Sequence, residues 1–360
     1  LFGDTGFWDT FRCLFPLLNL VYPDENVKMQ EGLVNTWKES GFLPEWSSPG
    51  HRGCMVGNNS ASVVADAWIK GLRGYDTDEL WKAVTHGAHA VHPEVSSTGR
   101  LGWEYYDSLG YVPCDVGINE NAARTLEYSY DDWTVGQLAK ALGDEETYRT
   151  FNDRGYWWRN VISDEGYCHM RDSKGQWLEN FDPFRSGANQ HYVEGNAWQL
   201  TFFVPQDVPA LVEKIGKQRF TDRLLWGFNQ DEAWRYNAPN DQYWDHPVVQ
   251  GNQQSMHFAF LFNYADTPWN TQRWSRSILD RYYGYGIANA YLGDEDQGQM
   301  GALGVLMAIG LFDVQGGAST TPQYEITSPI FDKVTIQLDN RYYPGKEVVI
   351  ETVNNSPKNV

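Results

Sequence analysis

The 360-residue sequence predicts a mainly α-helical protein that ends in a short antiparallel β segment. Two observations lead to this prediction. Between residues 7 and 312, apolar residues recur at helical spacing in about a dozen segments with mostly short connections. After a glycine pair at 316 and 317, the pattern changes to the apolar–polar alternation that is typical of strands. A series of helices of this kind closes into a bundle, a solenoid or a toroid, and the absence of a fixed repeat disfavours a solenoid.

The first helix is expected at residues 7–20, where Asp9 and Arg12 lie three positions apart on one side. That pair could clamp the hydroxyls of a ligand or bridge to each other. Residues 163–195 show no clear period and predict a long excursion over one face of the domain, and loops of this length usually line a site. The remaining helices are expected at residues 26–40, 61–71, 77–91, 119–142, 144–161, 195–203, 208–215, 218–228, 256–264, 271–283 and 297–312.

Strands are expected at residues 324–326, 333–338 and 347–353, with a turn at 339–340 between the last two. Three strands cannot bury both faces of a sheet by themselves. They are therefore expected to pack on the helical part or to pair with strands outside this sequence.

The net charge of the chain limits the classes of ligand that it can bind. The formal net charge is −19, from 47 acidic and 28 basic residues. Nucleic acids and anionic membrane surfaces would be repelled, so a neutral or cationic ligand fits better. Aromatic residues make up 15% of the sequence, which suits stacking on sugar rings, although aromatic-rich cores are commoner. With no apolar run near the ~20 residues of a membrane span and no signal peptide, the sequence is expected to be a mature soluble protein or a piece of one.

Cysteine and histidine spacing does not favour a metal site. Three histidines, His86, His89 and His92, recur at three-residue intervals, but Pro93 ends the run and no acidic partner falls on the same face. No Cys-x-x-Cys spacing occurs among the four cysteines, which are free or form one or two bridges. They are Cys13, Cys54, Cys114 and Cys168.

Two acidic sites stand ahead of apolar segments and are candidates for acid–base chemistry. Glu194 precedes an aromatic-rich run, where partial desolvation should raise the pKa of its carboxyl group. Asp294 and Asp296 precede the apolar run at 302–312. A carboxyl group with a raised pKa and a second one kept ionised form the minimal apparatus for splitting a glycosidic bond. Their structural alternatives are a helix N-terminal carboxylate and a solvated acidic turn.

Other polar pairs have simpler explanations. Asp131 and Asp132 lie inside the longest predicted helix and favour a buried structural network or a cap over chemistry. Asn252 and Gln253 would ordinarily be assigned to a helix cap.

Seven motifs follow one another along nearly the whole chain: Gly6-Phe-Trp-Asp-Thr-Phe-Arg12, Gly50-His-Arg-Gly-Cys-Met-Val-Gly-Asn-Asn-Ser60, Val64-Ala-Asp66, Leu126-Glu-Tyr-Ser-Tyr-Asp-Asp-Trp133, Glu194-Gly-Asn-Ala-Trp198, Leu261-Phe-Asn-Tyr-Ala265 with Pro268-Trp269, and Gly293-Asp-Glu-Asp-Gln-Gly-Gln299. In these motifs the sequence resembles the calcium-dependent exo-α-mannosidases of glycoside hydrolase family 92. The resemblance implies an (α/α)6 toroid, here residues 1–316, and a β-sandwich to which residues 317–360 would contribute an incomplete part. The family's N-terminal β-sandwich is missing ahead of Leu1, so the chain is expected to be an internal part of a longer polypeptide.

The resemblance also implies an activity and a site. The enzyme would be an inverting exo-α-mannosidase, secreted or otherwise outside the cytoplasm, that acts on mannose-capped glycans. Glu194 matches the general acid and Asp296 the general base, with Asp294 helping to position the attacking water. In an inverting enzyme the two carboxyl groups stand about 6.5–9.5 Å apart. Asn252 and Gln253 fall where the family binds its catalytic Ca²⁺, a hard ion that prefers oxygen ligands.

The mannose subsite would be lined by Trp8, Asp9, Arg12, Asp66 and Trp198. At three places this sequence departs from the family pattern. Gln253 stands where many members have Glu. Gln250 and Gly251 replace a His-Glu pair associated with α-1,2-linked substrates, so no linkage is assigned. Residues 301–305 lack the large aromatic side chains usual after the base.

Two alternatives to the mannosidase are kept. A mannosyl-phosphate diesterase on the same toroid has a better leaving group and could dispense with a strong acid, so the presence of Glu194 argues against it. In a catalytically silent carbohydrate-binding fragment, the carboxylates would only hydrogen-bond to hydroxyls.

Overall fold

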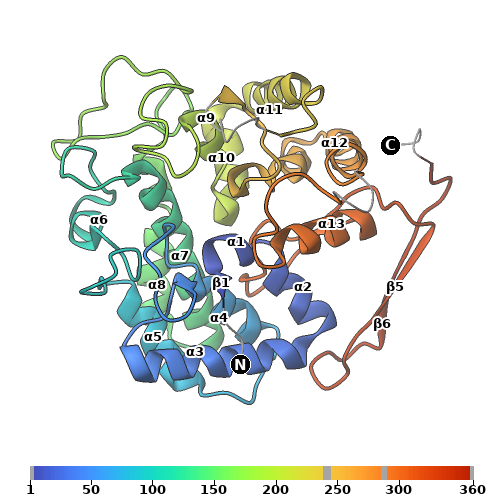
Figure 1. Ribbon diagram of the computed structural model, residues 1–360, viewed down its shortest axis with the longest axis horizontal. Coiled ribbons are helices and arrows are strands. Elements are labelled where there is room, and N and C mark those ends of the chain that lie inside the picture. Colours follow the sequence, from blue (N-terminus) through green and yellow to red (C-terminus); the bar gives the residue numbers. More distant parts are fainter. Residues whose placement is uncertain (1–3, 238–244, 285–289, 357–360) are drawn as a thin grey trace.

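The computed structural model describes residues 4–237, 245–284 and 290–356, and the mainly α prediction is confirmed (Figure 1). The longer helices of the first half are α2 (Leu14–Val21), α3 (Pro23–Ser40), α4 (Ser60–Ile69), α5 (Thr77–Gly87), α7 (Asn121–Leu142) and α8 (Glu145–Arg154). Those of the second half are α10 (Val208–Ile215), α11 (Lys217–Asp231), α12 (Pro268–Arg281) and α13 (Gln299–Ile309). Short helices are α1 (Phe7–Thr10), α6 (Trp103–Leu109) and α9 (Ala197–Leu200), and η5 (Gln253–Ser255) and η6 (Phe258–Ala265) are 3₁₀ helices.

The helices close into a ring around α1, which lies near the centre of the view in Figure 1. The last helix, α13, packs against both α12 and α2, so the end of the helical series meets its beginning. Helix α7 packs against α4 and α8, and its side chains are buried on all faces from Asn121 to Ala139. A helix that is buried all round belongs to the interior of a large domain. The arrangement places the loops that precede α9 and α13 near α1.

Several predicted helices have different limits in the structure. The segment 7–20 is interrupted at residues 11–13, which separate α1 from α2. The predicted helix at 256–264 is the 3₁₀ helix η6, and α6 was not predicted at all. The region 163–195 is a long excursion, as expected, and carries only isolated bridges and turns.

The β segment consists of two-residue and five-residue strands. β5 (Lys333–Gln337) and β6 (Glu347–Glu351) form the predicted antiparallel hairpin, with Lys333 opposite Glu351, and the hairpin lies at the edge of the molecule (Figure 1). β4 (Glu325–Ile326) instead pairs with β3 (Leu311–Phe312), immediately after α13. The β3–β4 pair thus joins residues from both sides of the predicted domain boundary at 316/317, and that division stays a prediction.

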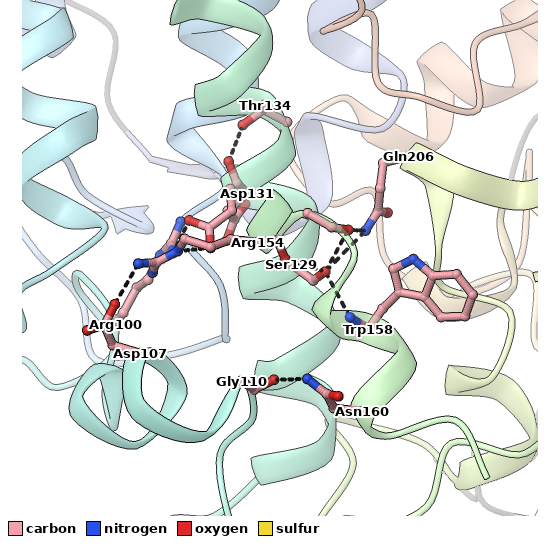
Figure 2. A network of polar contacts seen from close by, with 12 residues as sticks. Arg100, Asp107, Gly110, Ser129, Asp131, Thr134, Arg154, Trp158, Asn160 and Gln206 are labelled. Atoms are coloured by element: carbon pink, nitrogen blue, oxygen red, sulfur yellow. Dashed lines mark hydrogen bonds and ion pairs between the residues drawn. The ribbon is translucent and has the colours of Figure 1, made fainter. Parts of the chain in front are cut away.

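A buried ionic network anchors α7, as expected for Asp131 and Asp132 (Figure 2). The Asp132 carboxylate binds the guanidinium groups of Arg100 and Arg154, and Arg154 also reaches Asp107 at 2.7 Å. Asp131 accepts a hydrogen bond of 2.6 Å from the backbone N–H of residue 58. These aspartates therefore belong to the scaffold.

The three histidines of the 86–92 run pack against aromatic side chains. His86 and His92 pack edge-on against Phe42, and His89 packs against Phe151. All four cysteines are free thiols. Within the described ranges, every helix is too short or too polar to cross a lipid bilayer.

Candidate active site

One cavity of about 290 Å³ gathers the predicted catalytic residues. Among the segments that converge to build it are α1, the loop before α9, the start of η5 and the loop before α13, which are distant in sequence. The side chains that line it include Glu194, Asp294, Asp296, Asn252, Gln253, Trp8 and Asp9. The expectation that the two acidic loops face a common space therefore agrees with the geometry.

Glu194 is positioned by the start of α9. The Asn196 side chain caps this helix by accepting a 2.9 Å hydrogen bond from the N–H of Gln199, while the Gln199 side chain accepts from the N–H of Asn196. Asn196 supplies the cap, and Glu194 stands two residues ahead of it in the chain. Oε2 of Glu194 accepts a 3.0 Å hydrogen bond from Nδ2 of Asn252 inside the cavity.

Asp296 lies in a tight turn ahead of α13. Its Oδ2 accepts a 2.6 Å hydrogen bond from Nε2 of Gln253. Burial raises the pKa of Asp296, and the charges of Asp294 and Glu295 raise it further, whereas the hydrogen bond from Gln253 lowers it. Glu295 differs in role, because its Oε1 accepts from the N–H of Gly301 in the first turn of α13.

The two carboxylates are thus held by two consecutive amides, Asn252 to Glu194 and Gln253 to Asp296. Both acids also adopt left-handed backbone conformations, with φ of 46° at Glu194 and 55° at Asp296. Residues other than glycine rarely take this conformation, and where they do the surrounding structure enforces it, often at functional sites. The fold therefore fixes the directions of these side chains by two independent means.

Asp9 adds a fourth carboxyl group to the cavity, beside those of Glu194, Asp294 and Asp296. Burial raises its pKa to about 8, with contributions from Asp296 and Glu194 that the charge of Arg12 opposes. Its buried Oδ2 has no hydrogen-bond partner within the described residues. A protonated Asp9 can therefore donate a hydrogen bond to a ligand hydroxyl at neutral pH.

Trp8 is held from behind by groups that do not line this cavity. Its indole N–H donates to Oε1 of Glu127 at 2.8 Å, and its carbonyl accepts from Nε of Arg12 at 3.0 Å. The Arg12 guanidinium lies 5.2 Å from the Trp8 ring centre and 4.9 Å from that of Phe203. Arg12, predicted to contact the sugar, is therefore a buried support for Trp8.

Two further residues predicted for the mannose subsite, Asp66 and Trp198, are buried outside the cavity. Asp66 is fully buried in α4, where it accepts a 2.6 Å hydrogen bond from Asn19 and pairs with Lys70 one helical turn away. Trp198 is 1% exposed and packs edge-on against Phe202. Neither residue lines the cavity. The Asp66 carboxylate is paired with Lys70, and the Trp198 ring is packed in the aromatic core.

Amide side chains that sequence reasoning did not single out join the segments of the site. Gln254 donates to the carbonyl of Val193, and Gln297 accepts from the N–H of Gly6 at 3.2 Å. Gln299 accepts from the N–H groups of Cys13 and Leu14 at 3.1 and 3.2 Å. The available signal was the density of Asn and Gln beside each acidic motif. Trp46 and Met55, which also line the cavity, carried no such signal.

Paired carboxyl groups in one cavity are the apparatus that glycoside hydrolases use, so the site points to this class of enzyme. The comparison with known families agrees: residues 1–360 match the glycosyl hydrolase family 92 catalytic domain. The chain belongs to glycoside hydrolase family 92.

Solved structures of this family are similar to the chain over almost its full length. An inverting mannosidase of family GH92 from Bacteroides thetaiotaomicron is 36% identical, with a TM-score of 0.85, over 98% of this chain and 48% of that one. A second GH92 α-mannosidase from the same organism is 33% identical, with a TM-score of 0.86, over 99% of this chain and 45% of that one.

A curated relative, an uncharacterized secreted glycosidase from Arthroderma benhamiae, is 28% identical over 354 residues, which cover 89% of this chain and 43% of the relative. The chain thus spans about half the length of the relatives described here.

Proposed function

We propose that the chain carries the catalytic site of an inverting exo-α-mannosidase that removes terminal α-linked mannose from glycans. The observation that carries the proposal is the pairing of Glu194 and Asp296 across one cavity, each hydrogen-bonded to one of two consecutive amides. The GH92 mannosidases similar to this chain support the choice of sugar. Mannose release and inversion are both inferred for this chain.

In the proposed reaction Glu194 is the general acid. It protonates the glycosidic oxygen as the bond to the anomeric carbon breaks. Asp296 is the general base, which takes a proton from the water that attacks the opposite face of the ring, so the configuration inverts. Asp294 helps to position that water.

The size and chemistry of the cavity fit a single terminal sugar. Its volume of about 290 Å³ is at the lower end for small-molecule sites. Trp8 offers an aromatic surface, and the protonated Asp9 offers a hydrogen-bond donor beside the two catalytic acids. Binding one sugar unit in an enclosed space is what an exo-acting enzyme requires.

Calcium is part of the proposal. In the part of the chain that the structure describes, no group of three or more His, Cys, Asp and Glu side chains is arranged to hold a metal ion. An amide oxygen is available instead: Oδ1 of Asn252 is buried at the cavity and has no hydrogen-bond partner among the described residues. Asn252 and Gln253 would hold the ion, with sugar hydroxyls and water among the 6–8 oxygens that Ca²⁺ takes. When bound, Ca²⁺ would draw the hydroxyls at carbons 2 and 3 toward one plane and flatten the ring.

The experiment that tests the proposal compares two substrates in three proteins. Wild type, Glu194→Gln and Asp296→Asn would be assayed on an aryl α-mannoside with a good leaving group and on a mannose-capped glycan. We expect Glu194→Gln to lose about 10²–10⁴-fold on the glycan and much less on the aryl mannoside, since only the glycan needs protonation. Asp296→Asn should lose activity on both.

Each alternative has its own outcome. Equal rates of wild type and Glu194→Gln on the glycan would remove the acid assignment. Binding of mannose glycans without hydrolysis would favour the silent carbohydrate-binding fragment. Release of mannose from a mannosyl phosphate, with no reaction on either α-mannoside, would favour the diesterase.

A further inference from the structure

A second pocket, of about 430 Å³, lies beside the candidate active site and has no role in the chemistry above. We call it the tryptophan pocket and define it by Phe184, Arg185, Trp226, Trp234, Asp245 and His246. Trp226 is 44% exposed and Trp234 is 58% exposed. Two tryptophans exposed in one hollow leave apolar surface in water, and a concentration of such surface marks an interaction site.

The aromatic rings are fixed in a way that leaves Trp226 and Trp234 open to a ligand. The Trp226 ring contacts Phe184 and Trp198 at 5.9 Å between ring centres, at interplanar angles of 62° and 58°. The Trp234 ring meets His246 at 6.1 Å and 73°. Steep contacts of this kind hold a ring in place without another ring stacked on its face.

The polar groups of the pocket suit a neutral ligand that is rich in hydroxyls. Arg185 pairs with Asp245, and His246 Nδ1 lies 2.7 Å from Oδ1 of the neighbouring Asp231. These partners hold planar groups in fixed positions, so their remaining lone pairs and N–H groups can meet hydroxyls without further ordering. The Arg185–Asp245 pair carries no net charge, and the pocket has no second arginine or lysine among its described lining residues, which disfavours an anionic ligand.

The tryptophan pocket and the candidate active site are lined by neighbouring residues of the same chain segments. Asp245 and His246 stand a few residues ahead of Val249, which lines the catalytic cavity, and Trp234 stands ahead of Asn237, which also lines it. Gln199, whose side chain completes the cap beside Glu194, donates a 2.8 Å hydrogen bond to the carbonyl of His246. The same backbone segments therefore shape both places.

We infer that the tryptophan pocket binds a hexose unit of the glycan other than the terminal mannose being removed. The ring faces of Trp226 and Trp234 would cover the apolar C–H face of that sugar, and the fixed polar pairs would bind its hydroxyls. This inference rests on the proposed function, because it assumes a glycan substrate. It assigns the pocket to substrate capture and not to bond cleavage.

The test uses the full-length protein with Trp226→Ala or Trp234→Ala. Trp269→Ala is the matched control, because Trp269 is 59% exposed on α12 and lies outside both pockets. Binding of a mannose oligosaccharide would be measured by calorimetry in a Glu194→Gln background, and KM would be measured for the same oligosaccharide and for an aryl α-mannoside. We expect each pocket variant to weaken binding and raise the oligosaccharide KM about three- to tenfold, with the aryl KM unchanged. Trp234→Phe should restore most of the loss.

The result that overturns the inference is an unchanged affinity and KM in both pocket variants. Equal losses on the oligosaccharide and the aryl mannoside, accompanied by a lower Tm, would also overturn the inference. The tryptophans would then stabilise the fold, for example beneath another part of the polypeptide, and would not bind sugar. The proposed function fails in a different way, by absence of mannose release from either substrate in wild type. The calorimetric binding measurement does not depend on that outcome.

Discussion

Replacing Asp132 with alanine is expected to destabilise the protein strongly without altering the chemistry of the site. The Asp132 carboxylate is fully buried and binds two guanidinium groups, those of Arg100 and Arg154, which are 0% and 6% exposed. Arg100 binds Asp132 through Nη1, and its Nε and Nη2 have no hydrogen-bond partner among the described residues. Without the carboxylate, a buried cation would remain uncompensated.

The magnitude follows from that burial. Removing one partner of a buried ion pair costs about 3–5 kcal/mol, because the remaining charge cannot be solvated. An unfolding entropy of about 2.1 cal/mol/K per residue gives roughly 0.75 kcal/mol/K for 360 residues, so Tm should fall by about 4–7 °C.

Asp107 provides the matched control. It binds the same Arg154 at 2.7 Å but is 49% exposed, so Asp107→Ala should cost about 0–1 kcal/mol. The assay is thermal unfolding of wild type and both variants by calorimetry, with mannosidase activity measured well below Tm. Equal Tm values for Asp132→Ala and Asp107→Ala would refute the reasoning. If Asp132→Ala were as stable as wild type but inactive, Asp132 would have a role in catalysis and not in stability.

The other predictions concern the site and the thiols. Gln253→Leu removes the hydrogen bond that lowers the pKa of Asp296, so at saturating Ca²⁺ the acidic limb of the pH–rate profile should move to higher pH; an unmoved limb would show that Asp296 is not the base. Asp9 holds its proton in the folded state up to a pKa of about 8 but loses it near 3.8 when unfolded, so it makes stability fall as pH rises from about 4 to 8. Asp9→Asn should remove this pH-dependent loss of stability. The difference in Tm between the variant and wild type should therefore be more favourable to the variant at pH 8 than at pH 5. A calcium chelator should abolish activity, added Ca²⁺ should restore it, and Asn252→Ala should need more Ca²⁺ for half-maximal recovery; activity that is indifferent to the chelator would exclude the ion from the reaction. Because all four cysteines are free, dithiothreitol should leave Tm unchanged, and a lower Tm would reveal a disulfide.

Local sequence predicted the helices whose ends carry their own signals. Gly41, which has a φ of 76°, caps the end of α3, and the side chains of Asp76 and Asp144 cap the starts of α5 and α8. The interruption between α1 and α2 had no such signal. There, two backbone N–H groups at residues 13 and 14 donate to Gln299, a partner at the other end of the chain, which only the closed ring of helices brings close.

The site shows the same division. The acids Glu194 and Asp296 could be predicted because their motifs resemble those of a known family, and the structure brings both to one cavity. The residues that hold these acids in place could not be predicted from the sequence, because the hydrogen bonds of Asn252, Gln253 and Gln254 depend on which loops the fold places side by side. Asp66 could have been assigned to the scaffold, since Lys70 stands four residues later on the same helical face.

The most direct test of the account is the configuration of the first sugar released. Proton NMR of the anomeric region, recorded during hydrolysis of an α-mannoside, distinguishes β-mannose from α-mannose before mutarotation mixes them. If Glu194 and Asp296 act as acid and base on opposite faces of the ring, β-mannose must appear first. Initial release of α-mannose would contradict the account, because the second carboxylate would then have attacked the sugar itself.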